Sequence, residues 1–129
     1  KTCTPQMARD RLGAFLFQGE DVFKTVGNLS GGEQSRLRLC MLMDEKINLL
    51  ILDEPTRGVD VNAKFEIYSV INELAKAGIA VIMVSSELPE IINMCDNVCV
   101  IKAGRMTGML GRDELDQERI MQYAAGGEE

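Results

Sequence analysis

The sequence contains no histidine, no long hydrophobic segment and no excess of positive charge. A zinc site needs four close ligands; because histidine is absent, we expect Cys95 and Cys99 to be small core residues instead. The net charge of -6 argues against nonspecific nucleic-acid binding, which requires a basic surface, so no direct nucleic-acid partner is expected. No apolar run approaches the roughly 20 residues needed to span a membrane. There is no signal peptide and no sign of a secreted disulfide framework, which favours the reducing cytosol.

The composition is that of a globular domain or a part of one. The chain has 129 residues, of which 46% are hydrophobic and 26% are charged, and this balance allows a packed core. It begins with Lys1 rather than Met, so we expect an excised or processed piece of a longer protein.

Two almost wholly apolar segments, residues 47–52 and 79–84, predict strands that are buried on both faces of a parallel sheet. An amphipathic helix over residues 63–76 is predicted between them, which makes a βαβ unit with a right-handed crossover. Other elements are expected on either side of this unit. They are helices over residues 9–17, 32–44 and 87–94, a β-hairpin of residues 97–101 and 106–110, and a last helix from a cap at Asp116 through residue 125.

The first predicted strand ends in two adjacent carboxylates, Asp53 and Glu54. Carboxylates at the C-terminal end of a parallel strand face the crevice where α/β sheets bind ligands. Asp53 could hold Mg²⁺ directly or through a water, and Glu54 could orient or deprotonate a water that attacks a γ-phosphate. The alternative is a pair of solvated acids at a strand end.

A Ser-Gly-Gly turn, Ser30, Gly31 and Gly32, opens the helix predicted over residues 32–44. Glycines let backbone N–H groups approach an anion closely, and the N-terminus of a helix favours negative charge. The alternative is an ordinary N-cap, from Asn28 or Ser30, with a glycine turn.

Two further residues are weaker candidates. Asp60 follows Glu54 in a loop, and it could equally be a plain N-cap of the helix that begins near Ala63. Ser86 follows the second predicted strand, near the place where a γ-phosphate sensor could lie.

Together these residues resemble the ATP-binding cassette (ABC) ATPase family. The string LSGGEQ, residues 29–34, is similar to the family signature LSGGQ, and residues 49–54 are similar to the Walker B strand with its catalytic Glu. The string RGVD, residues 57–60, is similar to the D-loop, and Ser86 falls on the switch position, where most members have His. The resemblance implies an α/β fold, a P-loop NTPase-like parallel sheet with flanking helices that is incomplete, and a C-terminal β-hairpin plus helix.

The family binds ATP between two cassettes, so the resemblance implies different ligands for the two motifs. Ser30, Gly31, Gln34 and the intervening Gly32 would contact ATP held by a partner cassette, with Asp60 nearby. The other motif would serve the nucleotide site of this cassette itself. There Asp53 would hold Mg²⁺, and Glu54 and Ser86 would act on the bound ATP. The chain contains no GxxxxGK(S/T) loop, the Walker A motif that normally lies upstream of this region.

The two halves of the sequence resemble different subfamilies. Residues 12–23 (LGAFLFQGEDVF), followed by LSGGEQSRLRL, are similar to F-class ABC proteins, soluble twin cassettes that act on ribosomes. After Thr56 those proteins usually continue with Asn-His-Leu-Asp. This chain continues with RGVDVNAKFEIY and later VSSELPEII, which resembles sugar-importer cassettes of the ribose/galactose type. A chimera joined near residues 53–56 and a divergent natural cassette are the two explanations left open.

Three functions follow as hypotheses. The leading one is part of an importer ATPase at the cytoplasmic face of the cell membrane, with a sugar permease and a second cassette as partners. Residues 1–46 would end its helical subdomain, and residues 47–129 would carry the C-terminal part of the ATPase core. The second is an F-class factor on the ribosome. The third is an inert folding or interaction module, which could form a homodimer or a strand swap through an exposed sheet edge.

Overall fold

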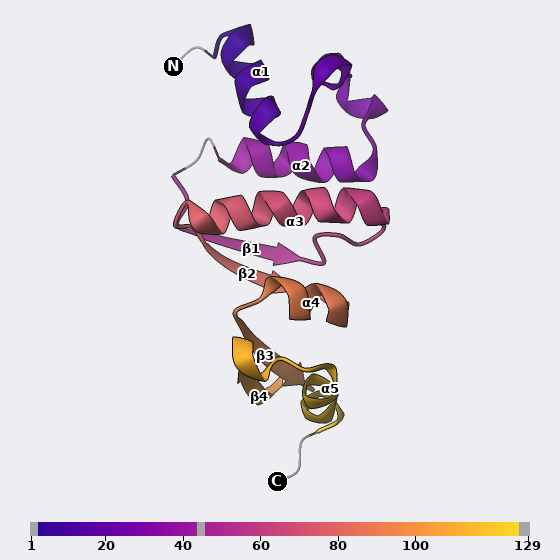
Figure 1. Ribbon diagram of the computed structural model, residues 1–129, viewed down its shortest axis with the longest axis vertical. Coiled ribbons are helices and arrows are strands. Elements are labelled where there is room, and N and C mark those ends of the chain that lie inside the picture. The colour runs from indigo at the N-terminus through magenta and orange to yellow at the C-terminus, as the bar shows by residue number, and fades with distance from the viewer. Residues whose placement is uncertain (1–2, 44–45, 127–129) are drawn as a thin grey trace. The chain divides into compact units, whose positions relative to one another are not determined.

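The structure, a computed structural model, describes residues 3–43 and 46–126 (Figure 1). The chain forms two compact units, Lys1–Val84 and Ser85–Glu129, and each is considered by itself. The predicted boundary after residue 46, between a helical subdomain and the ATPase core, is defined by the sequence motifs and not by the compact units of the fold. It stays a prediction.

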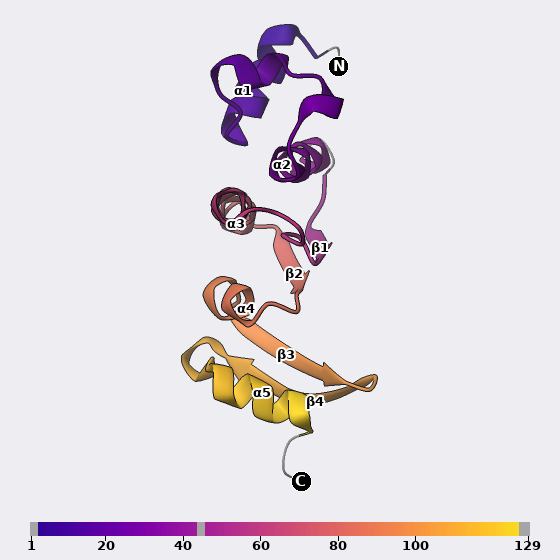
Figure 2. The ribbon, with the colours of Figure 1, turned by 90° about the vertical axis from the view of Figure 1, so that its right-hand side faces the viewer.

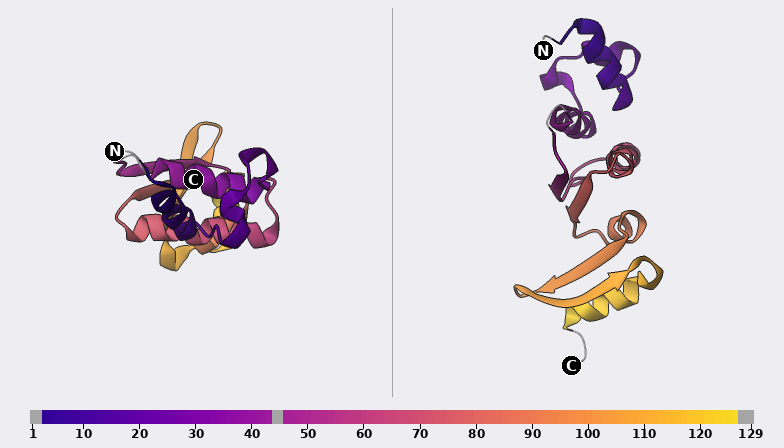
Figure 3. Two further views of the ribbon diagram at one scale, coloured as in Figure 1. Left: turned by 90° about the horizontal axis from the view of Figure 1, so that it is seen from above. Right: turned by 90° about the vertical axis from the view of Figure 1, so that its left-hand side faces the viewer.

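The first unit contains the predicted βαβ arrangement. Strand β1 (Leu49–Asp53) pairs in parallel with β2 (Ala80–Val84), and helix α3 (Val61–Lys76) connects them. Figure 3 shows α3 beside the two strands. The register joins Leu49 to Ala80 and Asp53 to Val84, so the two strands end together. The parallel sheet and the helix are thereby confirmed.

The two helices that precede β1 differ in their bounds from the predicted ones. Helix α1 (Pro5–Ala14) begins earlier than residue 9, because the side chain of Thr4 accepts a hydrogen bond from the Met7 N–H and caps it. It ends before residue 17, because Leu16 has a φ of 65°, outside the helical region. Helix α2 (Gly31–Leu42) begins after Ser30, and the predicted end at residue 44 lies outside the described residues.

One face of α3 supplies most of the core of this unit. Its buried side chains recur at helical spacing: Ala63, Ile67, Val70, Ile71 and Leu74. Leu50 of β1 is buried as well. A stripe at this spacing is typical of a helix packed on a sheet.

The prediction that both strands are buried on both faces is wrong for this chain. Residues alternate in exposure along β1 and β2, and Ile51 and Ile82 are 64% and 51% exposed. Since α3 packs on one side of a two-stranded sheet, the side chains that point the other way have no cover from the described residues of the first unit.

The second unit is a helix, a β-hairpin and a final helix. Helix α4 (Leu88–Met94) precedes β3 (Asn97–Lys102), which pairs antiparallel with β4 (Arg105–Gly111). The connecting residues Ala103 and Gly104 both have positive φ, as a two-residue hairpin turn of type I′ requires. The predicted hairpin is confirmed; β3 extends one residue beyond the predicted end, and β4 begins one residue earlier and ends one residue later than expected.

Helix α5 (Gln117–Ala125) lies along the hairpin (Figure 2) and begins at the predicted cap, Asp116. The core of this unit consists of Val98, Val100, Leu110 and Ile120.

None of the four cysteines, all of which lie in the described part of the chain, forms a disulfide. Cys95 is partly buried, but Cys99 is exposed, so the expectation of a core residue is wrong for Cys99 because it lies on the outward face of β3. Among residues 3–43 and 46–126 no cluster of three or more metal-binding side chains occurs. In the same part of the chain no helix is long and apolar enough to cross a membrane.

Candidate functional site

The N-terminus of α2 is built by a reciprocal pair of hydrogen bonds. Ser30 is the N-cap, and its hydroxyl accepts from the Glu33 N–H at 3.3 Å. The Glu33 carboxylate in turn accepts from the Ser30 N–H at 2.6 Å. Such a capping box satisfies two backbone donors that would otherwise lack partners, so the turn has a defined conformation. Of the two predicted caps, Asn28 and Ser30, Ser30 fills the position.

The two glycines of the turn have different surroundings. Gly31 is exposed, and a Cβ built on it would meet nothing within 4 Å. Gly32 is buried, and a Cβ there would lie 2.5 Å from the Cβ of Ala63 on α3. The backbone at Gly31 is therefore open to an approaching ligand, whereas Gly32 is needed for the close packing of α2 on α3.

The remaining predicted residue of this motif, Gln34, points back onto the turn. Its side-chain amide donates to the Leu29 carbonyl at 3.0 Å, and its backbone N–H donates to the Ser30 carbonyl at 2.9 Å. Gln34 therefore stabilises the turn rather than extending from it.

A lysine that the sequence reasoning missed adds charge to this end of the helix. Lys24 lies 2.7 Å from a carboxylate oxygen of Glu33 and 2.7 Å from one of Asp21. The hydrogen bond from Lys24, followed by that from the Ser30 N–H, lowers the pKa of Glu33 to about 2. Glu33 is thus ionised and paired at neutral pH. Nothing in the spacing of residues 24 and 33 indicates this contact.

Asp60 is the N-cap of α3, which is the second of the two roles that the sequence allows for it. Its carboxylate accepts from the Ala63 N–H at 3.0 Å. Asp60 and Ser30 also line the same open cavity of about 440 Å³, together with Lys24, Glu33 and Glu66. The N-termini of α2 and α3 thus face one shared cavity.

Asp53 and Glu54 lie where the sequence predicts, at the carboxyl end of β1. Asp53 is the last residue of the strand and is exposed. Glu54 is partly buried, has a φ of 47°, and donates its backbone N–H to the Val84 carbonyl at 2.8 Å. This positive φ turns the chain sharply between the two carboxylates. Neither residue lines the cavity at Ser30, so the structure does not bring the two motifs into one pocket.

Ser86 is exposed and belongs to the second unit. A neighbouring pair, which the sequence reasoning missed, is more deeply placed. Glu90 is buried and accepts a short hydrogen bond from the Ser85 hydroxyl, which itself accepts from the Glu87 N–H at 3.0 Å. These bonds shape the chain that leads from Ser86 into α4.

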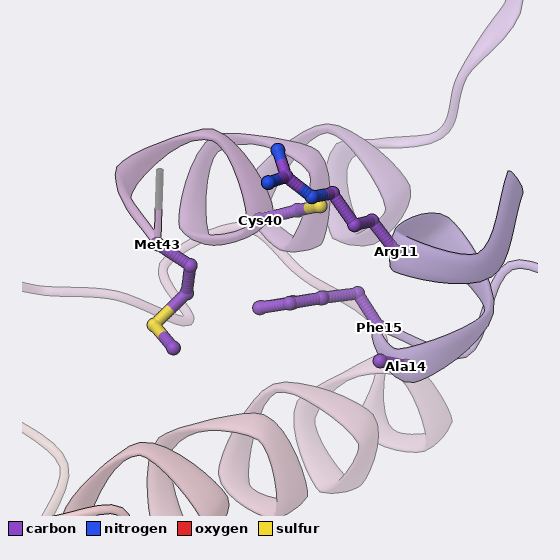
Figure 4. A pocket seen from close by; sticks show the side chains of 5 residues that line it. All are labelled: Arg11, Ala14, Phe15, Cys40 and Met43. Carbon is purple, nitrogen blue, oxygen red and sulfur yellow. The ribbon is translucent and has the colours of Figure 1, made fainter. Parts of the chain in front are cut away.

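A second, smaller cavity of about 200 Å³ lies between α1 and α2 (Figure 4). Its lining is mostly apolar and includes Phe15, Cys40 and Met43, with the Arg11 side chain near Cys40. None of the residues predicted to bind a nucleotide or a metal ion lines this cavity.

Comparison with known sequences relates this geometry to other proteins. Residues 2–57 match the protein family described as "ABC transporter". The "Ribose import ATP-binding protein RbsA" of Bacillus cereus is 55% identical over 123 residues, which are 95% of this chain and 25% of that protein. The "Xylose import ATP-binding protein XylG" of Moorella thermoacetica is 53% identical over 102 residues, 79% of this chain and 20% of that protein. The chain thus spans about a quarter of the length of such relatives.

Comparison with solved structures shows the same fold. MJ1267, "an ATP-binding cassette of an ABC transporter", matches with a TM-score of 0.75 at 20% identity, over 95% of this chain and 51% of that one. The cbiO1 protein of Clostridium perfringens matches with a TM-score of 0.74 at 28% identity, over 88% and 45%. These structural matches confirm the α/β fold, and the sequence matches confirm the resemblance to an ABC transporter ATPase domain with sugar-importer relatives.

Proposed function

We propose that this chain is part of the ATP-binding subunit of an ABC sugar importer, and that the longer protein binds and hydrolyses ATP to power import of a sugar. The observation that carries the proposal is the match to one ribose-import protein over 123 residues. A match of that length in a chain of 129 residues spans both the Ser30 turn and β1.

The Ser30 turn fits a phosphate group. It combines an exposed hydroxyl with an open backbone position at Gly31, at the N-terminus of a twelve-residue helix. In the proposed function this turn, with Gly32 and Gln34 holding its shape, contacts ATP bound by a second cassette. Asp60 caps α3, lines the same cavity as Ser30, and in this proposal keeps the N-terminus of α3 in place beside the bound ATP.

The end of β1 fits a magnesium–nucleotide complex, since Mg²⁺ prefers carboxylate oxygens and retains waters. Asp53, exposed at the strand end, holds the ion directly or through a water. Mg²⁺, when bound, neutralises charge on the phosphate oxygens. Glu54 orients the attacking water and accepts its proton, and Ser86, at the switch position, hydrogen-bonds to the γ-phosphate.

Phosphate binding by residues 1–129 alone is expected to be weak. The sequence has no GxxxxGK(S/T) loop to cradle the β- and γ-phosphates and no lysine placed on them by such a loop. Isothermal titration of the 129-residue chain with MgATP should therefore detect little or no heat of binding. Tight binding of MgATP would contradict the proposal that the phosphates are held mainly by a loop that this sequence does not contain.

The proposed partners follow from the same assignment. They are a second cassette across an ATP sandwich and a membrane permease that holds the subunit at the cytoplasmic face of the cell membrane. For the isolated chain, the outer edges of the two-stranded sheet also favour a homodimer or a strand swap, because no further strand among the described residues pairs with β1 or β2. Light scattering over a range of concentrations tests this, and a monomer at all concentrations would exclude it.

The alternatives weighed on the sequence are less well supported. A chimera, or an F-class factor on the ribosome, would explain the first half of the chain. However, one importer relative matches 95% of the chain, which favours a single importer origin for both halves. Co-sedimentation of the full-length protein with ribosomes, and not with a permease, would support the F-class function instead.

The decisive experiment is the substitution Glu54→Gln in the full-length protein. It keeps the size of the side chain but removes the base, so the ATPase rate should fall by about 10²-fold or more. Glu73→Gln, on the exposed surface of α3, is the matched control and should keep the wild-type rate. An unchanged rate in Glu54→Gln would remove Glu54 from the assigned role.

A further inference from the structure

The side chain of Arg36 on α2 is a buried cation that joins three segments of the first unit. The residue is 5% exposed. Its Nη1 donates to the Leu16 carbonyl at 3.2 Å and lies 3.1 Å from a carboxylate oxygen of Glu66 on α3. Its guanidinium also lies 5.1 Å from the centre of the Phe17 ring. One side chain thus connects α2, α3 and the turn that follows α1.

Arg36 and Glu66 continue a line of contact between two parallel helices. Helices α2 and α3 run side by side (Figure 1), and their first turns meet where Gly32 packs against Ala63. Arg36 follows Gly32 by one helical turn, and Glu66 follows Ala63 by nearly one turn. Two successive contacts along the same line restrict both the sliding and the rotation of one helix against the other.

The N-termini of these helices are the two turns that face the shared cavity. Ser30 caps α2, Asp60 caps α3, and both residues line that cavity with Arg36 and Glu66. The relative position of the two caps is therefore determined by the contacts between the two helices.

We propose that Arg36 and Glu66 are positioning residues that hold the Ser30 turn and the Asp60 turn together as one phosphate-facing end. This inference rests on the proposed function, because it assigns the two turns a common ligand. Neither residue touches the nucleotide in this proposal; both act through the placement of the two helix N-termini.

The charge of Glu66 is important because the other contacts of Arg36, the Leu16 carbonyl and the Phe17 ring, carry no formal charge. A guanidinium remains charged at all ordinary pH values, and a buried charge needs a partner. Nε of Arg36 has no hydrogen-bond acceptor among the described residues. Without the Glu66 carboxylate, the guanidinium gains hydration by moving outward, and α2 shifts with it relative to α3.

The test is Glu66→Gln in the full-length protein, with Glu73→Gln as the matched control. Both glutamates lie on α3 and pair with a cation, but the Glu73 pair with Lys76 is exposed. We expect kcat for ATP hydrolysis to fall about tenfold in Glu66→Gln, because small displacements of binding groups are costly to rate. KM for MgATP should change less than twofold, since the nucleotide's own cassette holds it. Glu66→Asp, which keeps the charge, should recover most of kcat.

Hydrogen exchange of the 129-residue chain supplies a readout that does not depend on turnover. The amides of Glu33 and Gln34, which donate to Ser30 at the start of α2, should exchange about tenfold faster in Glu66→Gln than in the Glu73→Gln control, since opening of the helix end becomes easier. Arg36→Lys should give the same pattern. Should Arg36→Lys fail to fold, the Glu66 variants still decide, because that side chain is 44% exposed and its replacement is compatible with folding.

Exchange and kcat that match the Glu73→Gln control would overturn the positioning role. A loss of kcat that only follows the loss of folded protein, measured by thermal unfolding, would overturn it as well. The proposed function is tested separately. If it is wrong, Glu54→Gln hydrolyses ATP at the wild-type rate, while exchange at the amides of Glu33 and Gln34 still supports or refutes the contact between Arg36 and Glu66.

Discussion

Gly32→Ala tests whether the second glycine of the Ser-Gly-Gly turn is required by packing. A Cβ at this position would lie 2.5 Å from the Cβ of Ala63 and 3.4 Å from Cγ1 of Val59. Non-bonded carbons favour separations of about 3.5–4.0 Å. Helix α2 would therefore have to move away from α3 by roughly 1 Å at its first turn.

The expected cost follows from two opposing effects. Overpacking of this kind destabilises by about 1–3 kcal/mol. Alanine in place of glycine in a helix contributes up to about 1 kcal/mol in the other direction. Gly31→Ala is the matched control, because a Cβ there meets nothing within 4 Å. The free energy of unfolding of Gly32→Ala should thus be lower than that of Gly31→Ala by about 1–3 kcal/mol.

Urea unfolding of the 129-residue chain, followed by circular dichroism, measures this difference as a shift in midpoint at constant slope. The double variant Gly32→Ala with Ala63→Gly removes the clash. Its loss of unfolding free energy should therefore be smaller, by about 1 kcal/mol or more, than the sum of the losses in the two single variants. Equal stability of Gly31→Ala and Gly32→Ala, or strict additivity in the double variant, would refute the close approach of the two helices.

Two further predictions concern titratable groups. Because the pKa of Glu33 is lowered to about 2 from 4.5, its capping contribution should be complete above about pH 4.5 and should disappear as the pH falls toward 2. Lys24→Met removes the main cause of this shift, so acid unfolding followed by circular dichroism should begin at a higher pH; an unchanged acid transition would contradict the pairing. Burial raises the pKa of the Cys95 thiol, so at pH 8 a thiol reagent should modify the exposed Cys99 at least several-fold faster, as measured by peptide mass spectrometry. Equal rates at the two sites would contradict this difference.

The elements that the sequence predicted well depend on local signals. The hairpin of β3 and β4 follows from a two-residue turn with Gly104, and α5 begins at its Asp116 cap. The strand, helix and strand from β1 to β2 follow from two apolar segments and a stripe at helical spacing. Such patterns act over a few residues, so a sequence alone reveals them.

The features that were missed depend on contacts between distant residues. Continuous apolar strands suggested cover on both faces, but cover depends on which other elements pack on the sheet, and Ile51 remains exposed. The pairing of Lys24 with Glu33, and of Arg36 with Glu66, joins segments that meet only in the folded chain. No periodicity of the sequence encodes either pair.

The Ser-Gly-Gly turn shows how one motif can contain two different requirements. As a sequence, Gly31 and Gly32 are equivalent members of an anion-binding turn. In the structure, Gly31 borders open space and Gly32 touches α3. A side chain at position 31 is therefore compatible with folding but would occupy the space in which we propose that a phosphate binds. A side chain at position 32 would instead displace the helix that carries Ser30, so that binding is lost through the fold rather than through the contact itself. The two glycines thus serve the same proposed ligand by separate physical routes, and a measurement of stability beside one of activity distinguishes them.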